Sequence, residues 1–308
     1  MNVYGTEQIR NVVLLGHGGA GKTTVAEALA LLTGVTKRMG KVPDGNTISD
    51  YDKEEVKRQF SISTTLIPLE YQGESGPIKI NLLDTPGFFD FVGEVEEAIS
   101  VADAAIIVVN CKAGIEPGTE KAWEMCEKYK LPRLIFVTNM DDDHASYREL
   151  VVKLETRFGR KIAPFQLPIR ENEKFVGFVN VVKMAGRRFT ELSDYVECEI
   201  PEYVEKNLTI ARDALIEAVA ETNEEYMERY FLGEEFTQEE ISTALREHVI
   251  EGEIVPVMMG SGINCQGFKV LLQSIDKYFP SPDHFECIGV DVSTGERFTA
   301  KYNDDVSL

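Results

Sequence analysis

Short apolar runs alternate with amphipathic stretches along most of the chain. Each run is bounded by polar or turn-forming residues, which is typical of strands buried on both faces of a parallel sheet. Between the first two runs, Val25, Leu29 and Leu32 recur at helical spacing, and Gly34 follows where that helix is expected to end. The pattern predicts an α/β fold with a doubly wound, mostly parallel sheet. The runs occupy residues 12–15, 78–83, 104–109, 134–137 and 254–258.

The pattern changes after Arg170. Residues 175–182 read as one strand of a hairpin that turns at Ala185 and Gly186. A long helix is expected next, because apolar residues recur on one helical face. This face consists of Leu208, Ala211, Leu215 and Val219.

A second helix start is marked by Thr237 and Glu240, which have the spacing of a capping box and precede apolar residues at helical spacing. The α/β pattern resumes at residue 254. We therefore expect residues 170–250 to be an inserted α+β subdomain, rather than a domain that follows the first one in tandem.

Composition and charge exclude several classes of partner. The chain has 308 residues, of which 43% are hydrophobic and 27% charged, so it can bury a sizeable core. Its net charge of −20 disfavours general attraction to phosphate backbones and anionic bilayers, so we expect no binding to free nucleic acid and no membrane partner. The longest apolar run is too short to span a bilayer and the first residues lack a signal-peptide pattern, so we expect a cytoplasmic protein.

A phosphate-binding motif follows the first apolar run. Residues 16–23 read GHGGAGKT and match GxxxxGK[ST] in full, directly before the predicted helix. The glycines let backbone amides converge on phosphate oxygens, the helix amino terminus adds partial positive charge, and Lys22 bridges the terminal phosphates. Thr23 is expected to place its hydroxyl on Mg²⁺. The predicted phosphate-binding residues are Gly16, His17, Gly18, Gly19, Ala20, Gly21, Lys22, Thr23 and Thr24.

A second motif, DTPG at residues 84–87, follows the run 78–83. An acidic residue at the carboxyl end of a sheet strand can hold a Mg²⁺-bound water, and a glycine there can offer its amide to a γ-phosphate. Taken alone, DTPG is also compatible with a plain β-turn. Beside the phosphate-binding motif, we interpret it as a loop in which Asp84 and Gly87 sense the nucleotide.

These motifs resemble the guanine-nucleotide domain of translational GTPases, together with the segment 52–65, the strand before Asn139 and the triplet Gly260, Ser261 and Gly262. The inserted region resembles the extra subdomain of elongation factor G and its relatives, which include the tetracycline-resistance ribosomal protection proteins. The resemblance covers nearly the whole chain. It implies GTP or GDP and Mg²⁺ as cofactors, GTP hydrolysis, and the ribosome as partner in protein biosynthesis.

The resemblance also implies a domain organisation. Residues 1–169 and 251–283 would form a P-loop GTP-binding domain, interrupted by the insertion. Residues 284–308 would form a linker and the start of a β-barrel domain that the sequence cuts short. We expect the chain to be a monomer.

The base-reading motif of the family, NKxD, is altered here. A gap-free alignment places Thr138, Asn139, Met140 and Asp141 there, whereas a register slipped by one residue pairs Asn139 with Asp142. The carboxylate of Asp141 can accept two hydrogen bonds that guanine supplies and adenine does not. The acidic residues 141–143 are also compatible with a simple helix cap. In either register the family's lysine is missing. The predicted base-site residues are Thr138, Asn139, Asp141, Ser261 and Gly262.

The catalytic residues depart from the family as well. Phe88 follows DTPG where the family generally has a histidine that orients the attacking water, and a phenyl ring cannot do this by hydrogen bonding. Lys22, Gly87 and the Phe88 position form the predicted catalytic set, and we expect very slow intrinsic hydrolysis. Thr23, Ser61 and Asp84 form the predicted metal set, with Ser61 at the family's threonine position.

Two smaller departures concern the phosphate end of the site. Gly19 stands where many relatives have an aspartate, which puts a dependence on potassium in doubt. Residues 58–60 read RQF in place of the usual RGI. Two alternatives to a ribosome-stimulated GTPase stay open. Phe88 supports a GTP-binding switch with little or no hydrolysis, and the altered NKxD motif supports an ATP-using P-loop enzyme.

Overall fold

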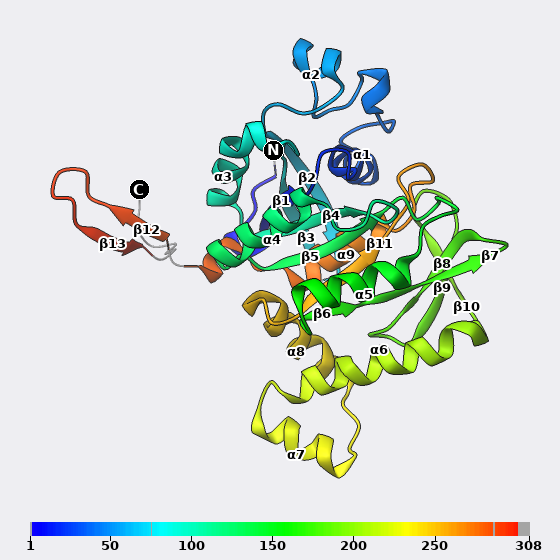
Figure 1. Ribbon diagram of the computed structural model, residues 1–308. Coiled ribbons are helices and arrows are strands. Elements are labelled where there is room, and N and C mark those ends of the chain that lie inside the picture. Colours follow the sequence, from blue (N-terminus) through cyan, green and yellow to red (C-terminus); the bar gives the residue numbers. More distant parts are fainter. Residues whose placement is uncertain (1, 75, 286, 301–308) are drawn as a thin grey trace.

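The computed structural model describes residues 2–74, 76–285 and 287–300 (Figure 1). A seven-stranded sheet of the order β2-β3-β1-β4-β5-β11-β6 forms its centre. Only the β2–β3 pair is antiparallel among the registered pairs of this sheet. The strands are β1 (Ile9–Leu15), β2 (Thr65–Gly73), β3 (Gly76–Asp84), β4 (Ala104–Asn110), β5 (Arg133–Thr138), β6 (Ile162–Pro164) and β11 (Val255–Met259).

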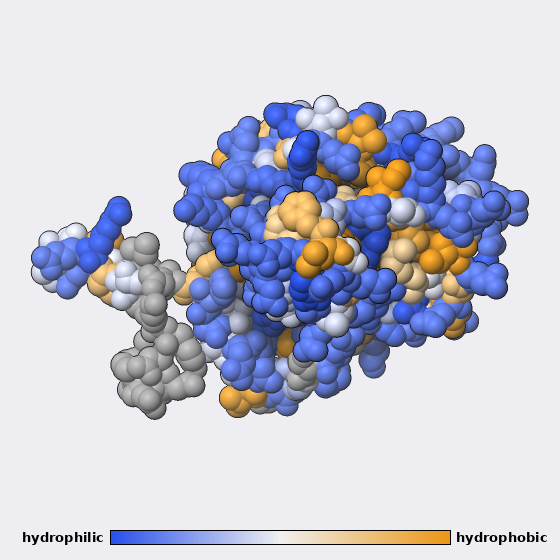
Figure 2. Space-filling view, turned by 90° about the horizontal axis from the view of Figure 1, so that it is seen from below, coloured by the Kyte–Doolittle hydropathy of each residue, from blue (hydrophilic) through white to orange (hydrophobic). Residues whose placement is uncertain are grey.

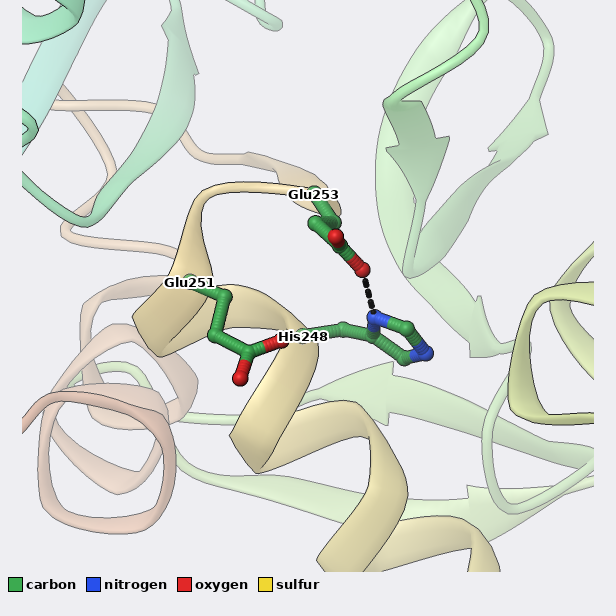
Figure 3. A group of neighbouring side chains, drawn as sticks. All are labelled: His248, Glu251 and Glu253. Carbon is green, nitrogen blue, oxygen red and sulfur yellow. Dashed lines mark hydrogen bonds and ion pairs between the residues drawn. The ribbon is translucent and has the colours of Figure 1, made fainter. Parts of the chain in front are cut away.

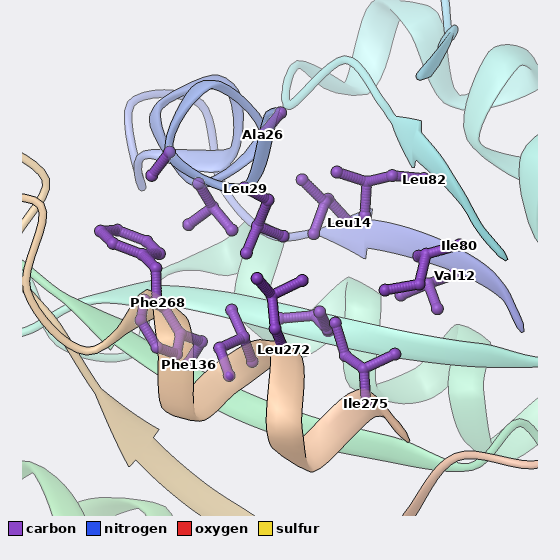
Figure 4. Close-up of a cluster of buried hydrophobic side chains, with 14 of the residues drawn as sticks. Val12, Leu14, Ala26, Leu29, Ile80, Leu82, Phe136, Phe268, Leu272 and Ile275 are labelled. Carbon is purple, nitrogen blue, oxygen red and sulfur yellow. The ribbon is translucent and has the colours of Figure 1, made fainter. Parts of the chain in front are cut away.

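Helices cover both faces of this sheet, because successive residues of each buried strand point to opposite sides. Val12 and Leu14 of β1 belong to one hydrophobic cluster, and Val13 and Leu15 belong to the other. Figure 4 shows the first cluster, in which Leu29 and Phe268 pack against β1 and its neighbours. The predicted doubly wound α/β fold is confirmed. The helices are α1 (Lys22–Leu32), α2 (Lys53–Arg58), α3 (Val92–Val101), α4 (Pro117–Tyr129), α5 (Tyr147–Phe158) and α9 (Phe268–Tyr278).

A second sheet and three helices occupy the chain between β6 and β11. Four antiparallel strands in the order β10-β9-β8-β7 form this sheet. It begins slightly before residue 170, where the sequence predicts the insertion to start, and the division into domains stays a prediction. The elements are β7 (Gln166–Glu171), β8 (Lys174–Asn180), β9 (Ala185–Phe189), β10 (Tyr195–Cys198), α6 (Glu202–Ala220), α7 (Glu224–Leu232) and α8 (Gln238–Glu251).

The helix predictions for this region are confirmed, but the predicted hairpin turn is wrong. Leu208, Leu215 and Val219 are buried on α6, and a capping box starts α8. The turn between β8 and β9 occupies residues 181–184, so Ala185 and Gly186 lie in β9. The Asn180 side chain accepts a hydrogen bond from the Lys183 amide at 2.7 Å. This bond closes the turn before Ala185, earlier in the chain than predicted.

The described carboxyl-terminal part forms an antiparallel hairpin of β12 (Cys287–Val290) and β13 (Arg297–Ala300), which lies to one side of the main sheet in Figure 1. Residues 301–308 of the predicted linker and barrel start lie outside the described residues. Short 3₁₀ turns complete the fold at Thr6–Gln8, Val42–Asp44, Phe89–Phe91 and Pro282–His284. Within the part of the chain that the structure describes, no helix has the length and apolarity needed to cross a membrane.

Candidate nucleotide-binding site

The phosphate-binding motif forms the loop between β1 and α1, at the carboxyl edge of the main sheet. Gly16 has φ +142°, and a Cβ atom there would collide with the carbonyl oxygen of Val108. Gly21 adopts the left-handed conformation at the start of α1. The loop can therefore close tightly only with glycine at these positions, and it leads directly into a helix amino terminus, which favours bound anions.

Lys22 is buried at the base of this loop. Its ammonium group donates hydrogen bonds to the carbonyl oxygens of Gly16 and His17, each at 3.0 Å. Burial lowers the pKa of Lys22 to about 8, although the neighbouring Asp84 carboxylate raises it. A buried cation with incomplete compensation favours an anionic ligand, because the ligand restores the stabilisation that water gave.

Two carboxylates and three hydroxyls converge beside Lys22. The Oδ2 atom of Asp84 accepts hydrogen bonds from Thr23 at 2.9 Å and from Ser49 at 2.5 Å. Ser61 donates to Asp50 Oδ1 at 2.7 Å, and its hydroxyl lies 3.4 Å from that of Thr23. The predicted metal-site residues Thr23, Ser61 and Asp84 are thus brought together, while Ser49 and Asp50 were not predicted.

This group of oxygen atoms fits a Mg²⁺ ion. Asp84 Oδ1 and Asp50 Oδ2 are buried and have no hydrogen-bond partner among the described residues. Burial raises the pKa of both carboxyl groups, that of Asp84 to about 6. Hard oxygen ligands with uncompensated buried carboxylates are the donor set that Mg²⁺ prefers. The only sequence signal for Ser49 and Asp50 was their place just before the segment 52–65.

A cavity of about 240 Å³ lies between the phosphate-binding loop and the segments around Ser61 and Gly87. Gly87 packs so closely on the loop that a Cβ atom there would lie 2.5 Å from Lys22 Nζ and 2.7 Å from Gly18 Cα. The DTPG segment therefore touches the phosphate-binding loop directly. This contact puts Gly87 directly beside Lys22 and Gly18.

Phe88 forms part of the wall of this cavity. Its ring lies against Gly18 and makes an edge-to-face contact with the ring of Phe60, with 4.8 Å between centroids. Phe60 was noted only as a departure from the family and not predicted to lie in the site. The two aromatic rings supply an apolar contact and no hydrogen-bonding group at this position.

His17 contributes its backbone rather than its side chain. Its carbonyl oxygen accepts from Lys22, whereas its Nδ1 atom accepts a hydrogen bond from the Gly118 amide at 3.2 Å. The Nε2 atom lies 3.6 Å from a carboxylate oxygen of Glu116, directly before α4. The imidazole thus packs on the start of α4 and does not line the cavity.

The predicted base-site segments meet beside the phosphate-binding loop. Thr138 donates a hydrogen bond to the carbonyl oxygen of Ala20 at 2.7 Å. The Gly260 amide donates to Val137, and the Gly260 carbonyl accepts from the Met140 amide at 3.3 Å. Residues 138–146 are therefore held against both neighbouring segments. We call them the base-reading loop because the sequence predicts the base site there. Ser261 is buried, and Gly262 lies against Thr24.

The two candidate aspartates of this loop differ in their contacts. Asp142 accepts hydrogen bonds from the His144 amide at 2.8 Å and from Lys112 Nζ at 3.2 Å, and these bonds lower the pKa of Asp142. Asp141 is half-buried and makes no side-chain hydrogen bond or ion pair within the described residues. Asn139 is exposed with φ +59°, whereas Met140 is buried.

A separate cluster of ionisable groups lies at the end of α8 (Figure 3). The Nδ1 atom of His248 lies 2.6 Å from a carboxylate oxygen of Glu253, and Glu251 is close by. The carbonyl oxygen of His248 accepts hydrogen bonds from the amides of Glu253 and Ile254. These contacts close the end of α8 where the chain returns to the main sheet.

Together, these features define a P-loop nucleotide-binding domain. Residues 7–281 match the family of the elongation factor Tu GTP binding domain, and the chain belongs to this family. Membership of the family implies that the nucleotides are GTP and GDP.

A solved structure with a similar fold supports the same class. A crystal structure of a protein from Thermus thermophilus superposes with a TM-score of 0.84 at 35% sequence identity, over 96% of this chain and 45% of that chain. This chain therefore spans less than half the length of that similar protein. The predicted class, a translational GTPase domain, is confirmed.

Proposed function

We propose that the chain binds GTP and GDP together with Mg²⁺, and that the protein to which it contributes hydrolyses GTP on the ribosome to drive translocation or ribosome remodelling. One observation carries the proposal, namely that buried Lys22 and Asp50 line one cavity, while Asp84 lies directly behind its wall, hydrogen-bonded to Thr23 and with its Oδ1 atom unpartnered among the described residues. A bound Mg²⁺ would neutralise charge on the phosphates. Lys22 and the amides of residues 16–23 would bind and orient these phosphates.

The base would be read by Asp141. The support for this register is that Asp142 is already engaged by Lys112 and the His144 amide, while Asp141 keeps its acceptor atoms for a ligand. Thr138, the first residue of the motif in the gap-free register, ties the loop to Ala20 of the phosphate-binding loop. Asn139, Ser261 and Gly262 would complete the base site.

Hydrolysis would be slow in the chain alone. Lys22 and the backbone of Gly87 would stabilise charge on the phosphates, but the Phe88 ring offers no group that could order an attacking water. The packing of Phe88 on Phe60 and Gly18 also supports the alternative function, a GTP-binding switch that hydrolyses little or no GTP.

Single-turnover hydrolysis of GTP by the full-length protein, with and without ribosomes, tests the proposal and separates these two functions. We expect stimulation by ribosomes if the protein is a ribosome-dependent GTPase. Tight GTP binding without stimulation would favour the switch. Hydrolysis of ATP at a rate equal to that of GTP would contradict both.

A further inference from the structure

Arg170 connects the inserted sheet to the base-reading loop. It lies on β7, and its Nη2 atom donates hydrogen bonds to the carbonyl oxygens of Met140 at 2.8 Å and Ala145 at 3.2 Å. Its Nη1 atom donates to the carbonyl oxygen of Glu173 at 2.7 Å, in the turn that follows β7. One guanidinium group therefore bridges two segments that are separate in the sequence.

The two loop carbonyls that Arg170 binds lie on either side of Asp141. The Met140 carbonyl belongs to the peptide group that leads directly into Asp141, and Ala145 stands near the end of the loop. Fixing both carbonyls restricts the loop around Asp141 and hence the direction of its carboxylate. A planar guanidinium with several donors is well suited to this, because it binds two acceptors without changing its own shape.

Arg170 is itself held by the first turn of α6. The Tyr203 hydroxyl accepts a hydrogen bond from the Arg170 amide at 2.8 Å and donates one to the Arg170 carbonyl oxygen at 3.0 Å. Within the described residues, Arg170 forms no ion pair, so its charged hydrogen bonds go to backbone carbonyls. Such charge-assisted bonds are about twice as strong as neutral ones.

We propose that Arg170 is a positioning residue for guanine recognition, through which the inserted sheet and α6 hold Asp141 toward the base. The inference rests on the proposed function of Asp141. It explains how an ordered base site can exist although Asn139 replaces the lysine expected there. The loop is anchored from outside by Arg170 on one side and by the Lys112–Asp142 ion pair on the other.

The test compares the affinities of the chain for GDP and for inosine 5′-diphosphate, which lacks the exocyclic amino group that Asp141 is proposed to bind. Arg170→Ala should weaken GDP about tenfold, because charge-assisted hydrogen bonds that order the loop are lost. It should weaken the binding of inosine 5′-diphosphate much less, so the ratio of the affinity for GDP to the affinity for inosine 5′-diphosphate should fall. Arg170→Lys should lower this ratio less than Arg170→Ala does, because a lysine keeps the positive charge but lacks the planar group of several donors.

Arg188→Ala is the matched control, since Arg188 lies on β9 of the same sheet and pairs with Glu171 instead of the loop. It should leave the ratio unchanged. In an Asp141→Asn background, Arg170→Ala should no longer change the ratio, because the group that it positions is altered. Tyr203→Phe, which keeps the guanidinium, should change the ratio in the same direction as Arg170→Ala.

An equal loss of affinity for both nucleotides would overturn the inference. An unchanged affinity ratio in folded Arg170→Lys and Tyr203→Phe would overturn it as well. These two variants decide the question if Arg170→Ala melts at a much lower temperature than the original chain. Failure of the proposed function would look different, because the unsubstituted chain would then show no preference for GDP over inosine 5′-diphosphate or would not bind GDP at all.

Discussion

Lys22, which lines the cavity, and Asp84, which lies behind its wall, are both buried, and burial disfavours the charge of each. Desolvation lowers the pKa of Lys22 and raises that of Asp84. They compensate each other only in part, so a phosphate and a divalent cation bound together would satisfy both. Sequence motifs predicted these two residues, because GxxxxGK[ST] and DTPG have fixed local spacing.

The pKa of Asp84 makes metal binding depend on pH. Burial raises it from 3.8 to about 6, against hydrogen bonds from Ser49 and Thr23. Mg²⁺ needs the carboxylate, so its affinity for the GDP-bound chain should fall as the pH falls through about 6. Mg²⁺ titrations at about pH 5 and about pH 7.5 measure this, with Asp84→Asn as the control that removes the dependence.

The sign of the accompanying stability change follows from linkage. The folded chain favours the protonated acid of Asp84, so this stabilisation is complete below the ordinary pKa of 3.8 and is lost as the pH rises through about 6. Added Mg²⁺ should offset the loss above that pH. Equal Mg²⁺ affinity at both pH values would show that Asp84 is not a metal ligand.

Asp141 determines base choice in the gap-free register. Asp141→Asn should weaken guanine nucleotides and favour xanthine nucleotides, because an amide can donate to the oxygen that xanthine carries in place of the amino group. Competition binding of GDP and xanthosine diphosphate measures the change. If Asp142→Asn produces the switch and Asp141→Asn does not, the slipped register is correct.

At the level of helices and strands, local pattern predicted the elements whose environment is simple. Apolar runs predicted the strands β1, β3, β4, β5 and β11. Strands that are buried on both faces have apolar residues on both, so they appear in the sequence as continuous apolar runs. The edge strand β2 was missed because its side chains alternate between exposed and buried, and β6 because it is only three residues long.

In the candidate site too, local sequence pattern predicted only the residues that belong to motifs. Thr23 and Asp84 belong to recognisable motifs, but other contacts of the site depend on how residues 49–61 fold. Ser49 contacts Asp84, Asp50 contacts Ser61, and Phe60 contacts Phe88. No spacing along the chain encodes such contacts. Arg170 likewise had no sequence signal, since its partners are backbone carbonyls that any residue supplies.

The capping box of α8 allows a stability prediction. Thr237 accepts a hydrogen bond from the Glu240 amide at 3.2 Å, and Glu240 accepts one from the Thr237 amide at 2.7 Å. Thr237→Ala should lower the free energy of unfolding by about 1 kcal/mol, as loss of such a cap usually does. Chemical denaturation measures this against Thr209→Ala, an exposed mid-helix control that should have little effect. No difference between the two variants would contradict the cap.

For the molecule as a whole, charge and surface limit the kind of partner. The net charge is −20, and Figure 2 shows a largely hydrophilic face, with separate hydrophobic patches, on the side where α7 lies in Figure 1. Such a surface disfavours unspecific attraction to RNA, so ribosome binding would have to be local.

Phe88→His tests whether hydrolysis depends on the proposed ribosome partner. In the chain alone the substitution should raise single-turnover GTP hydrolysis very little, because a histidine needs a second surface to hold it against the water. In the full-length protein on ribosomes the gain should be large. Rapid multiple-turnover hydrolysis by the unsubstituted protein on ribosomes would show that another group positions the water.

Calorimetric titration of the chain with GDP, GTP and ATP in the presence of Mg²⁺ tests most directly whether the cavity is a guanine-nucleotide site. We expect GDP and GTP to bind and ATP to bind far more weakly, and we expect Lys22→Ala to abolish binding because it removes the buried cation that meets the phosphates. Equal affinity for ATP and GTP, or unchanged GDP affinity in Lys22→Ala, would contradict the assignment of this cavity.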